Sequence, residues 1–486
     1  GFNSLTANTT GTYNISIGAN SMVTNTTGSN NVAVGQDALR LSTASNNTAI
    51  GFLALTANTT AANNTAVGYQ AGYSNQTAGN NSVYGYQAGY SNTAGGAFTA
   101  IGYLAGRENT TGNYITALGS NALQANTTAN NNTAVGYAAL TANTTGTYNV
   151  AVGSSALAAN TTASYGTAVG DGALLRNTTG TENVALGQLN LAFNTTGSGN
   201  TSVGRAALYA NTTASNNTAV GNNALAENTT GTRNVALGAI SLDANTTGND
   251  NTAVGYSSLS SNVTGTRNTA LGAYALDIST GDDNTALGRA AMDVNTSGGS
   301  NTAVGSNALG ANTTASNNTA VGYQALNANT TGANNVAVGK SALYANTVGA
   351  SNTALGFSSL SANTTGTGNH ALGSGALQNL TTGNNNIGIG VQAGAYTTLL
   401  TTGSSNVLIG HVVHTSAADT TYAVGIGYNL SCEGSYTTLG QDSTDSRLAH
   451  GGTTWATVSD ERYKKDIVDS TAGLSFINAL RPRTFK

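Results

Sequence analysis

The hydrophobic and polar positions of this chain repeat with a period of seventeen residues. NTAVGYAALTANTTGTY (132–148) is followed at once by NVAVGSSALAANTTASY (149–165). In each copy Ala and then Val, Leu or Ile precede a glycine, Ala-Leu stands three and four residues after it, and Asn-Thr-Thr usually comes next. A fixed period of this length indicates a repeat architecture.

The glycine that ends each N-T-A-V-G element, here called the corner glycine, measures how far the repeat extends. From Gly18 to Gly390 there are 23 corner glycines and 22 intervals, of which 20 are seventeen residues long. The other two, 35–51 and 272–288, are sixteen residues long. The pattern therefore covers most of the chain.

The repeat predicts short strands and turns, because Gly and paired Asn and Thr recur too often for a helix of useful length. T-A-V or V-A-V makes one short strand, with its β-branched residue and its Val on one face and its Ala on the other. The corner glycine turns the chain, a second short strand carries Leu, and Asn and Gly turn it back. Stacked coils would pair through parallel strands, so that like residues form columns along the axis.

We therefore expect an all-β fold, a parallel β-solenoid or β-roll of seventeen-residue coils. A coil this small has room inside for little more than one Val and one Leu, so its Ala-lined faces would remain exposed. Small residues on a second face permit another chain to approach closely. This predicts a homo-oligomer, with a homotrimer preferred.

Charge is scarce, as this architecture requires. Charged residues make up 7% of the chain, against a typical value of roughly 25%. A charge repeated in every coil would face its own copy, and facing like charges are destabilising. The net charge of −4, with no basic cluster in the repeats, offers no footprint for nucleic acid.

Other features of the sequence bound the setting. Cys432 is the only cysteine, so no intrachain disulfide forms and the redox compartment stays open. No apolar run approaches the ~20 residues that span a bilayer, so we expect no membrane insertion. The start, GFNSLTANTT, is not a signal peptide and enters within a repeat without Met. This suggests a processed product or a piece of a longer protein.

The repeats resemble a known family of surface proteins. Runs such as NTAVGYQALNANTTG and NVAVGKSALYANTVG are similar to the head repeats of trimeric autotransporter adhesins, over roughly residues 14–390. The resemblance implies a trimer of interlocked left-handed β-rolls. This chain departs from that family in its longer repeat, enlarged by Asn and Thr, and shows no membrane anchor of the kind an autotransporter carries.

Charge gathers at the end of the chain, where 7 of the 15 Lys and Arg residues follow position 446. The segment TTWATVSDERYKKDIVDSTAGLSFINALRPRTFK resembles the start of the endosialidase-type intramolecular chaperone of phage tail fibres and tailspikes. Its signature, Ser-Asp-x-Arg-x-Lys followed by an apolar residue and, after a helix, Arg-Pro, matches at six positions: Ser459, Asp460, Arg462, Lys464, Ile467 and Arg481-Pro482.

The resemblance implies that this segment trimerises a fibre and can cut itself off. Ser459 would then be the nucleophile, Lys464 the general base and Val458-Ser459 the scissile bond. A Ser hydroxyl needs a neighbour to take its proton, and a desolvated Lys can do so. Lys465 is an alternative base. The plainer interpretation is that Ser459 caps a helix whose first turn carries the acidic pair.

The expected organisation has four parts. They are a solenoid shaft at 1–390, a β-rich closure region at 391–446, an extended linker at 447–458 and, at 459–486, the start of the chaperone with a short α-helical segment. After Gly390 the glycine spacing becomes irregular, which sets the first boundary.

Other residues are weaker candidates for chemistry. His411 and His414 stand on opposite faces of a strand, so one chain would not chelate a metal with both, and we expect no metal and no cofactor. Asp282-Asp283 lacks calcium-loop spacing and is expected at the surface. Tyr residues that follow corner glycines could bind a saccharide or protein, but turn packing is the commoner reason. The N-T-T triplets match glycosylation acceptors.

Together these features predict a structural, adhesive protein rather than an enzyme. The first hypothesis is the shaft of a homotrimeric viral, phage-like tail fibre for host attachment, located in the virion or outside the cell. Its partners would be further copies of itself, other virion tail proteins and a host-surface receptor such as a saccharide. The alternatives are a bacterial cell-surface trimeric adhesin and an ice-binding β-solenoid, the latter suggested by Thr columns.

Overall fold

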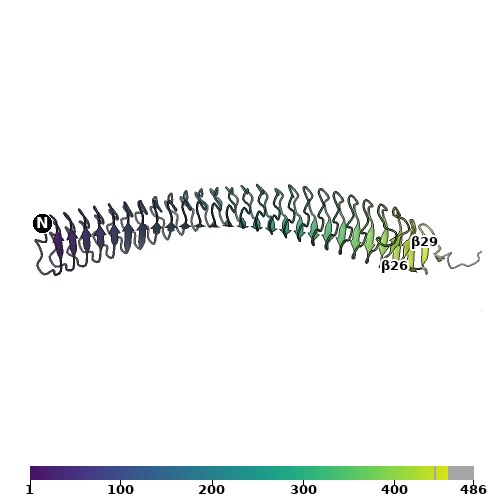
Figure 1. Cartoon of the computed structure of the whole chain (residues 1–486), viewed down its shortest axis with the longest axis horizontal. Helices are drawn as coiled ribbons and strands as arrows, with labels where there is room; N and C mark the ends of the chain where they lie inside the picture. Colours follow the sequence, from purple (N-terminus) through teal and green to yellow (C-terminus); the bar gives the residue numbers. More distant parts are fainter. Residues whose placement is uncertain (443–444, 458–486) are drawn as a thin grey trace, which may run out of the picture. The chain divides into compact units, whose positions relative to one another are not determined.

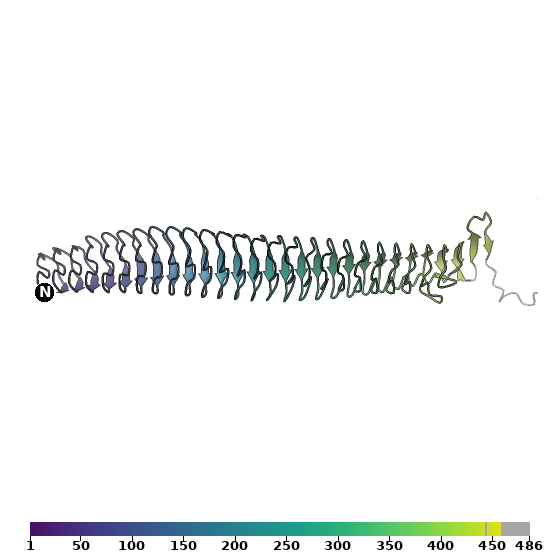
Figure 2. The ribbon, with the colours of Figure 1, turned by 90° about the horizontal axis from the view of Figure 1, so that it is seen from above.

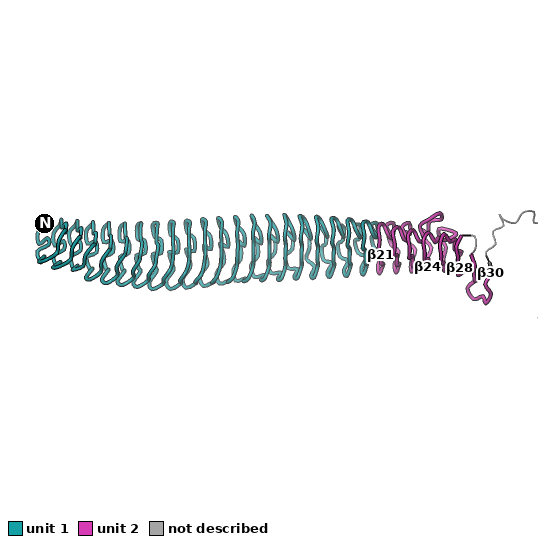
Figure 3. Tube along the Cα trace, turned by 90° about the horizontal axis from the view of Figure 1, so that it is seen from below, with its two compact units in different colours: residues 1–349 teal, residues 350–486 magenta. Residues whose placement is uncertain are grey.

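The computed structural model describes residues 1–442 and 445–457, and these form an all-β structure of strands and turns. The chain divides into two compact units, 1–349 (unit 1) and 350–486 (unit 2), coloured teal and magenta in Figure 3. Each unit contains stacked coils with parallel strands. The predicted fold class, a parallel β-solenoid of about seventeen-residue coils, is confirmed.

The strands of unit 1 are β1 (Ile15–Ile17), β2 (Val32–Val34), β3 (Thr48–Ile50), β4 (Thr65–Val67), β5 (Ser82–Tyr84), β6 (Phe98–Ile101), β7 (Ile115–Leu118), β8 (Thr133–Val135), β9 (Val150–Val152), β10 (Thr167–Val169), β11 (Val184–Leu186), β12 (Thr201–Val203), β13 (Thr218–Val220), β14 (Val235–Leu237), β15 (Thr252–Val254), β16 (Thr269–Leu271), β17 (Thr285–Leu287), β18 (Thr302–Val304), β19 (Thr319–Val321) and β20 (Val336–Val338). Those of unit 2 are β21 (Thr353–Leu355), β22 (His370–Leu372), β23 (Ile387–Ile389), β24 (Val407–Ile409), β25 (His414–Thr415), β26 (Val424–Tyr428), β27 (Ser431–Cys432), β28 (Tyr436–Gln441), β29 (Ser446–Ala449) and β30 (Ala456–Thr457).

Within unit 1 the strands β1 to β20 pair in parallel, each with the strand of the neighbouring coil. Thr133 of β8 lies opposite Val150 of β9, and Val135 lies opposite Val152, so each repeat position meets its own copy. Figures 1 and 2 show these strands side by side, one per coil. The register also survives the short coils, since Thr269 pairs with Thr285.

The interior of unit 1 is narrow and made largely of Ala and Leu. In the coil around Gly136, Ala134, Ala139 and Leu140 are fully buried, whereas Thr133 and Val135 face outward and are half-buried. The expectation that Val lies inside and Ala remains exposed is therefore wrong. The pleat turns only the middle strand residue inward, and beside the buried Leu of the common coil the space there admits only a methyl group. Val83 occupies this position where Gly72 and Gly89 replace Leu.

The segment after the corner glycine is a turn and not a second strand. Leu140 has a φ of 52° and Ala138 a φ of 53°, so extended and left-handed residues alternate. The ladder nevertheless continues, because the Leu140 N–H donates to the carbonyl of Ala156 at 3.0 Å. The prediction of a second strand was therefore wrong, because coils can stack through backbone hydrogen bonds without an extended backbone.

The corner glycine is a steric requirement of the stack. Gly136 has a φ of +137°, a conformation that residues with a Cβ rarely adopt. A Cβ at this position would also lie 2.4 Å from the carbonyl oxygen of Gly153 in the next coil. Both the turn and the contact between coils therefore exclude a side chain here.

Two columns of buried Asn side chains hold the coils together. In the first, the Asn143 Nδ2 donates to Asn126 Oδ1 of the previous coil and to the Gly146 carbonyl, both at 3.0 Å. In the second, Asn132 Oδ1 accepts from the Asn149 backbone N–H at 2.9 Å, while Asn132 Nδ2 donates to the Gly146 carbonyl at 2.8 Å. Buried amides need such partners, and the repeat supplies them coil after coil.

The sixteen-residue coils omit one residue directly after the first Asn column. Ser42 and Ser279 stand where the other coils have Asn, and S-T-A or S-T-G replaces N-T-T-G. The Asn58 Nδ2 donates to Ser42 Oγ at 3.1 Å, and the Asn295 Nδ2 to Ser279 Oγ at 3.3 Å. The shorter turn thus keeps the strand register and the bond from the following coil, whereas Asn262 Oδ1, on the other side of Ser279, is buried without a hydrogen-bond partner.

A different core occurs between residues 68 and 115. Gly72, Gly89 and Gly106 replace the usual Leu, and Phe98 and Ile115, both buried, replace Asn before the strand. A Cβ on Gly89 or Gly106 would lie 2.7 or 2.5 Å from the Phe98 ring. One aromatic ring therefore fills the space of the Leu side chains of two coils.

Unit 2 also stacks parallel strands, β21 to β24, β26 and β28. It then changes to antiparallel pairing of β28 with β29 and of β29 with β30. Residues 391–446, expected as β-rich closure, hold β24 to β28 and the start of β29; the segment expected as a linker holds the rest of β29 and β30. The expected helix within 459–486 lies outside the described residues.

Candidate interaction surfaces

The outward sheet face of unit 1 is apolar and uncharged. We define this face as the residues one and three positions before each corner glycine, from Ile15 and Ile17 to Val336 and Val338. The position nearer the glycine is Val, Leu or Ile in every coil of unit 1 except at Tyr84, and the other position is mostly Thr with some Val. No residue of this face is charged.

The aliphatic column of this face is open to solvent. Leu186, Leu237 and Leu271 are 36, 37 and 42% exposed, although the Ala between each such residue and the Thr column is fully buried. Large exposed aliphatic side chains are ordinary when scattered, but a continuous stripe of them marks an interaction site. The period of two along each strand creates the stripe, and the stacking of coils extends it.

A ladder of alternating charges occupies one turn of four consecutive coils. Arg233, Asp250, Arg267 and Asp283 stand at the same repeat position, with φ between 57 and 60°. Arg233 Nε and Nη2 donate to Asp250 at 2.6 and 2.8 Å, and Arg267 binds Asp283 in the same two-pronged way at 2.6 and 2.9 Å. In-register stacking therefore brings together opposite charges here.

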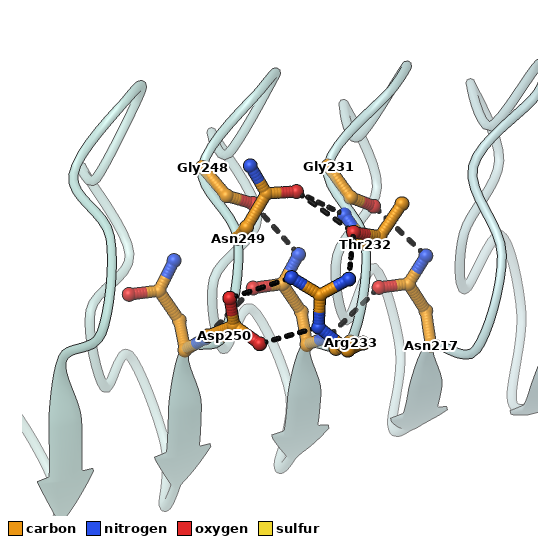
Figure 4. Close-up of polar contacts among 9 residues, drawn as sticks. Asn217, Gly231, Thr232, Arg233, Gly248, Asn249 and Asp250 are labelled. Carbon is orange, nitrogen blue, oxygen red and sulfur yellow. Dashed lines mark hydrogen bonds and ion pairs between the residues drawn. The ribbon is translucent and has the colours of Figure 1, made fainter.

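Neighbouring side chains order this ladder, as Figure 4 shows. Asn249 Oδ1 accepts from the Thr232 backbone N–H at 2.7 Å and from its hydroxyl at 2.9 Å, and Arg233 Nη1 donates to Thr232 Oγ1 at 3.2 Å. Hydrogen bonds from Arg233 lower the pKa of Asp250, and those from Arg267 lower the pKa of Asp283. The pairs are exposed, so they set turn geometry more than they stabilise the fold.

An acidic column that the sequence pattern did not single out lies five residues after the corner glycines. Asp243, Asp277 and Asp293 occupy it, with Ser260 between the first two, and Ser257 Oγ donates to Asp277 at 3.0 Å. Burial raises the pKa of Asp243 and of Asp293, and the charge of Asp277 adds to both shifts. Within the described residues, no group of His, Cys, Asp and Glu has a geometry that would hold a metal ion.

Aromatic rings form ladders on the coils between residues 51 and 107. Phe52, Tyr69, Tyr86 and Tyr103, each directly after a corner glycine, stack with centroids 5.4, 5.2 and 5.4 Å apart. Turn packing was the commoner expected reason for Tyr residues at this position, and the contacts between the stacked rings are packing of this kind. The rings are nevertheless 38 to 53% exposed.

The other candidates from the sequence fall in separate places. His411 stacks on Tyr428, whereas His414 Nδ1 lies 3.1 Å from the Val412 carbonyl and its ring contacts Tyr396 edge-on. The two His side chains thus have different partners. Asp283 pairs with Arg267, and Asp282 accepts from Thr266 at the surface.

Burial makes Cys432 a poor nucleophile. The Cys432 thiol is fully buried, and desolvation together with the charge of Asp445 raises its pKa to about 12. The thiolate, which is the reactive form, is therefore scarce at neutral pH. Val458, Ser459, Lys464 and Lys465, the residues of the expected self-cleavage site, lie outside the described residues.

Comparison of this chain with protein-family models, with curated proteins and with solved structures finds no match. A search of the described residues for a long apolar helix of membrane-spanning type also finds none. Function must therefore be argued from the surfaces themselves.

Proposed function

We propose that this protein is the shaft of a homotrimeric fibre of the viral tail-fibre type, which serves in attachment to a host surface. The observation that carries the proposal is the outward sheet face of unit 1. It combines a hydrogen-bonded sheet, a column that is aliphatic in every coil except at Tyr84 and a complete lack of charge, and this is the surface that a second copy of the same chain would cover.

The energetics favour self-association. Each buried aliphatic side chain contributes roughly 25 cal/mol per Å² of apolar surface removed from water. A single column residue, less than half exposed, gains little from this, but the column repeats the gain in coil after coil. An interface of this kind would extend over many coils and contain no charge, and large interfaces with few charges are typical of obligate homo-oligomers.

Closed symmetry supplies the arrangement. Three rods can direct one sheet face each toward a common axis, which buries all three faces and leaves the turns outside. A face-to-face dimer is the other closed arrangement. The resemblance of residues 459–486 to the start of a trimerising chaperone favours three copies, and it is also the basis for proposing maturation through Ser459 and Lys464.

The arrangement of the carboxylates supports a structural role over an enzymatic one. The described carboxylates are paired with Arg, spread along a turn column or isolated. Hydrolysis of a glycan would need two carboxylates positioned about a bound substrate. We therefore propose a virion or extracellular location, with other tail proteins and a host receptor as partners.

Light scattering on the full chain after size exclusion tests the proposal. We expect a particle of three chains, and a variant that carries Leu186→Lys and Leu237→Lys to dissociate because it places charge in the interface. Thr179→Lys with Thr230→Lys is the matched control, since both residues lie in the same two coils on exposed turns. A monomeric wild type, or dissociation of the control alone, would contradict the proposal.

The Thr column gives the ice-binding alternative one supporting observation, since the hydroxyl-bearing residues do face outward in register. The column beside it is aliphatic, however, and an interface between copies would cover both. Thermal hysteresis measured on the dissociated Lys variant and on the wild type separates the two functions. Activity in the wild type would favour ice binding, and its absence would favour the fibre.

A further inference from the structure

The aromatic ladder of unit 1 is the feature that neither the stack nor the assembly face explains. We call Phe52, Tyr69, Tyr86 and Tyr103 the aromatic strip. Its interplanar angles of 23, 6 and 15° make it a nearly parallel stack along the rod. The rings belong to the first turn of the coil and lie outside the outward sheet face.

The fold does not need aromatic residues at this position. Ser120, Ser154, Asn222 and Ala239 stand directly after corner glycines in other coils of the same unit. Those coils keep the same strand pairing and the same buried Ala and Leu. The strip is therefore an addition to the coil and not a condition for it.

The same coils differ from the rest of unit 1 in further ways. Tyr73 and Tyr90, four residues after Tyr69 and Tyr86, form a second stack with centroids 5.0 Å apart, and the Arg107 guanidinium lies 5.9 Å from the Tyr90 centroid. These two Tyr residues follow the Gly residues that replace Leu around Phe98. The core and two turn columns thus change together over the same coils.

The chemistry around the strip selects an uncharged ligand. The sequence contains no Asp, Glu, Lys or Arg between Arg40 and Arg107, and Arg107, in the last of these coils, forms an ion pair with the adjacent Glu108. An anionic ligand such as a phosphate or a sulfate would therefore find no unpaired cation along the strip. Polar neutral groups are present instead, because the phenol hydroxyls end the rings and Gln87 Nε2 donates to Gln70 Oε1 at 2.7 Å on the adjoining positions.

The geometry of the strip suits a repeating ligand. The nearly parallel rings have centroids 5.2 to 5.4 Å apart, a separation found in offset stacks, and each ring residue is 38 to 53% exposed, so the stack leaves aromatic surface accessible. The coils repeat at the strand spacing of about 4.8 Å, close to the length of one pyranose unit in an extended glycan chain. Sugar rings combine apolar C–H faces with hydroxyl rims, which match aromatic faces flanked by phenol and carboxamide groups.

We propose that the aromatic strip binds a neutral, linear polysaccharide that lies along the axis of unit 1. The polysaccharide would be the ligand in the proposed attachment function, and the proposal depends on that function only for its biological setting. The geometry requires the coils of unit 1 and does not require a trimer.

Affinity electrophoresis and calorimetry on the full chain test this site. The probes are hydroxyethyl cellulose, cellohexaose and mannohexaose, with dextran sulfate as the charged comparison. A variant with Tyr69→Ser, Tyr86→Ser and Tyr103→Ser uses a residue that other coils carry at this position, so the fold should persist by circular dichroism. Tyr86→Ser alone, which interrupts the strip at its centre, is a milder second variant.

We expect at least one neutral probe to bind, the triple variant to lose tenfold or more in affinity, and Tyr86→Ser to lose part of it. The control is Tyr137→Ser with Tyr323→Ser, which removes exposed Tyr residues at the same repeat position outside the strip and should change nothing. The proposal is overturned if no neutral probe binds, if only dextran sulfate binds, or if the control loses as much. Light scattering on the same samples reports assembly separately, so failure of the trimer and failure of the site are distinguishable.

Discussion

At the scale of single residues, Asn is the side chain on which the stack depends most. Asn143 is fully buried, and its amide joins two coils and one turn. A carboxamide can donate and accept at once, so a column of Asn satisfies itself at any length. The sequence showed that Asn recurs, but not that its side chain points inward, because Asn is also the ordinary residue of an exposed turn.

Removing one Asn side chain from the buried column should destabilise the neighbouring coils locally. Asn143→Ala removes the donor to Asn126 Oδ1 and the acceptor of Asn160 Nδ2, which costs about 2 kcal/mol or more. We expect faster amide hydrogen exchange in the coils on either side of residue 143. Thr145→Ala, an exposed change in the same turn, is the control and should have no effect; equal exchange in both variants would refute this role.

The buried Asn residues also decide which glycosylation acceptors are usable. In N-T-T triplets such as that of Asn143 the acceptor amide is buried and doubly bonded, whereas in N-N-T triplets the first Asn, as at Asn46, Asn216 and Asn317, is exposed. Expressed in a secretory eukaryotic cell, the chain should therefore carry glycans at the N-N-T positions and lack them at N-T-T. Peptide mapping by mass spectrometry checks this, and folded protein modified at Asn143 would contradict it.

Asp445 should make unit 2 sensitive to pH. It is buried, and desolvation together with the charge of Asp442 raises its pKa to about 6, from an ordinary value of about 3.9. The folded state then binds more protons than the unfolded state between these values, so its stability falls as the pH rises from about 4 to about 6. Asp445→Asn should melt higher than the wild type at pH 7.5 and equally at pH 4. A pH-independent difference would exclude this cause.

At the scale of one coil, the strand and the corner were predictable and the filling of the interior was not. Alternation in T-A-V indicates two faces, and the glycine column indicates the turn. Neither observation shows which strand face is inside the coil, and the larger side chains were wrongly expected to lie inside. The width of the coil decides which strand residue faces inward, because the narrow interior accommodates Ala134 and not Val135. That width depends on the turn conformations, which the sequence pattern does not specify.

The Phe98 coils offer a test of this packing. Phe98→Ala should cost about 3–5 kcal/mol, as for other buried aromatic truncations. Replacing Phe98 by Asn, Val83 by Ala and both Gly89 and Gly106 by Leu restores the common residues at these four positions, since Val83 also lies against Gly89. This quadruple variant should recover most of the loss, because Leu at this position already has the φ near +50° that Gly89 and Gly106 adopt. Thermal or denaturant unfolding measures both variants.

Failure of the quadruple variant to recover would mean that the Phe98 ring does not stand in for two Leu side chains. The matched control is Gly136→Leu, at a corner where a Cβ would meet the next coil. It should destabilise the chain in any background.

At the scale of the whole molecule, the sequence predicted the repeat and the parallel stacking because seventeen-residue periodicity has few other physical explanations. It predicted association with another copy because the Ala-lined faces were expected to be exposed, and the structure removes that reason, since these faces are internal. The association itself stays a prediction. The outward sheet face now carries the same proposal on firmer ground. The expected self-cleavage at Ser459 stays a prediction.

Disulfide trapping tests the central claim, association through the outward sheet face in register, most directly. Leu237→Cys places one thiol on this face, and the native Cys432 is buried; Thr230→Cys, on the exposed turn of the same coil, is the control. If the faces of three identical chains meet at the axis, mild oxidation of Leu237→Cys yields covalent dimers on a non-reducing gel and Thr230→Cys yields none. Equal cross-linking of the two variants, or none in Leu237→Cys, would contradict the account.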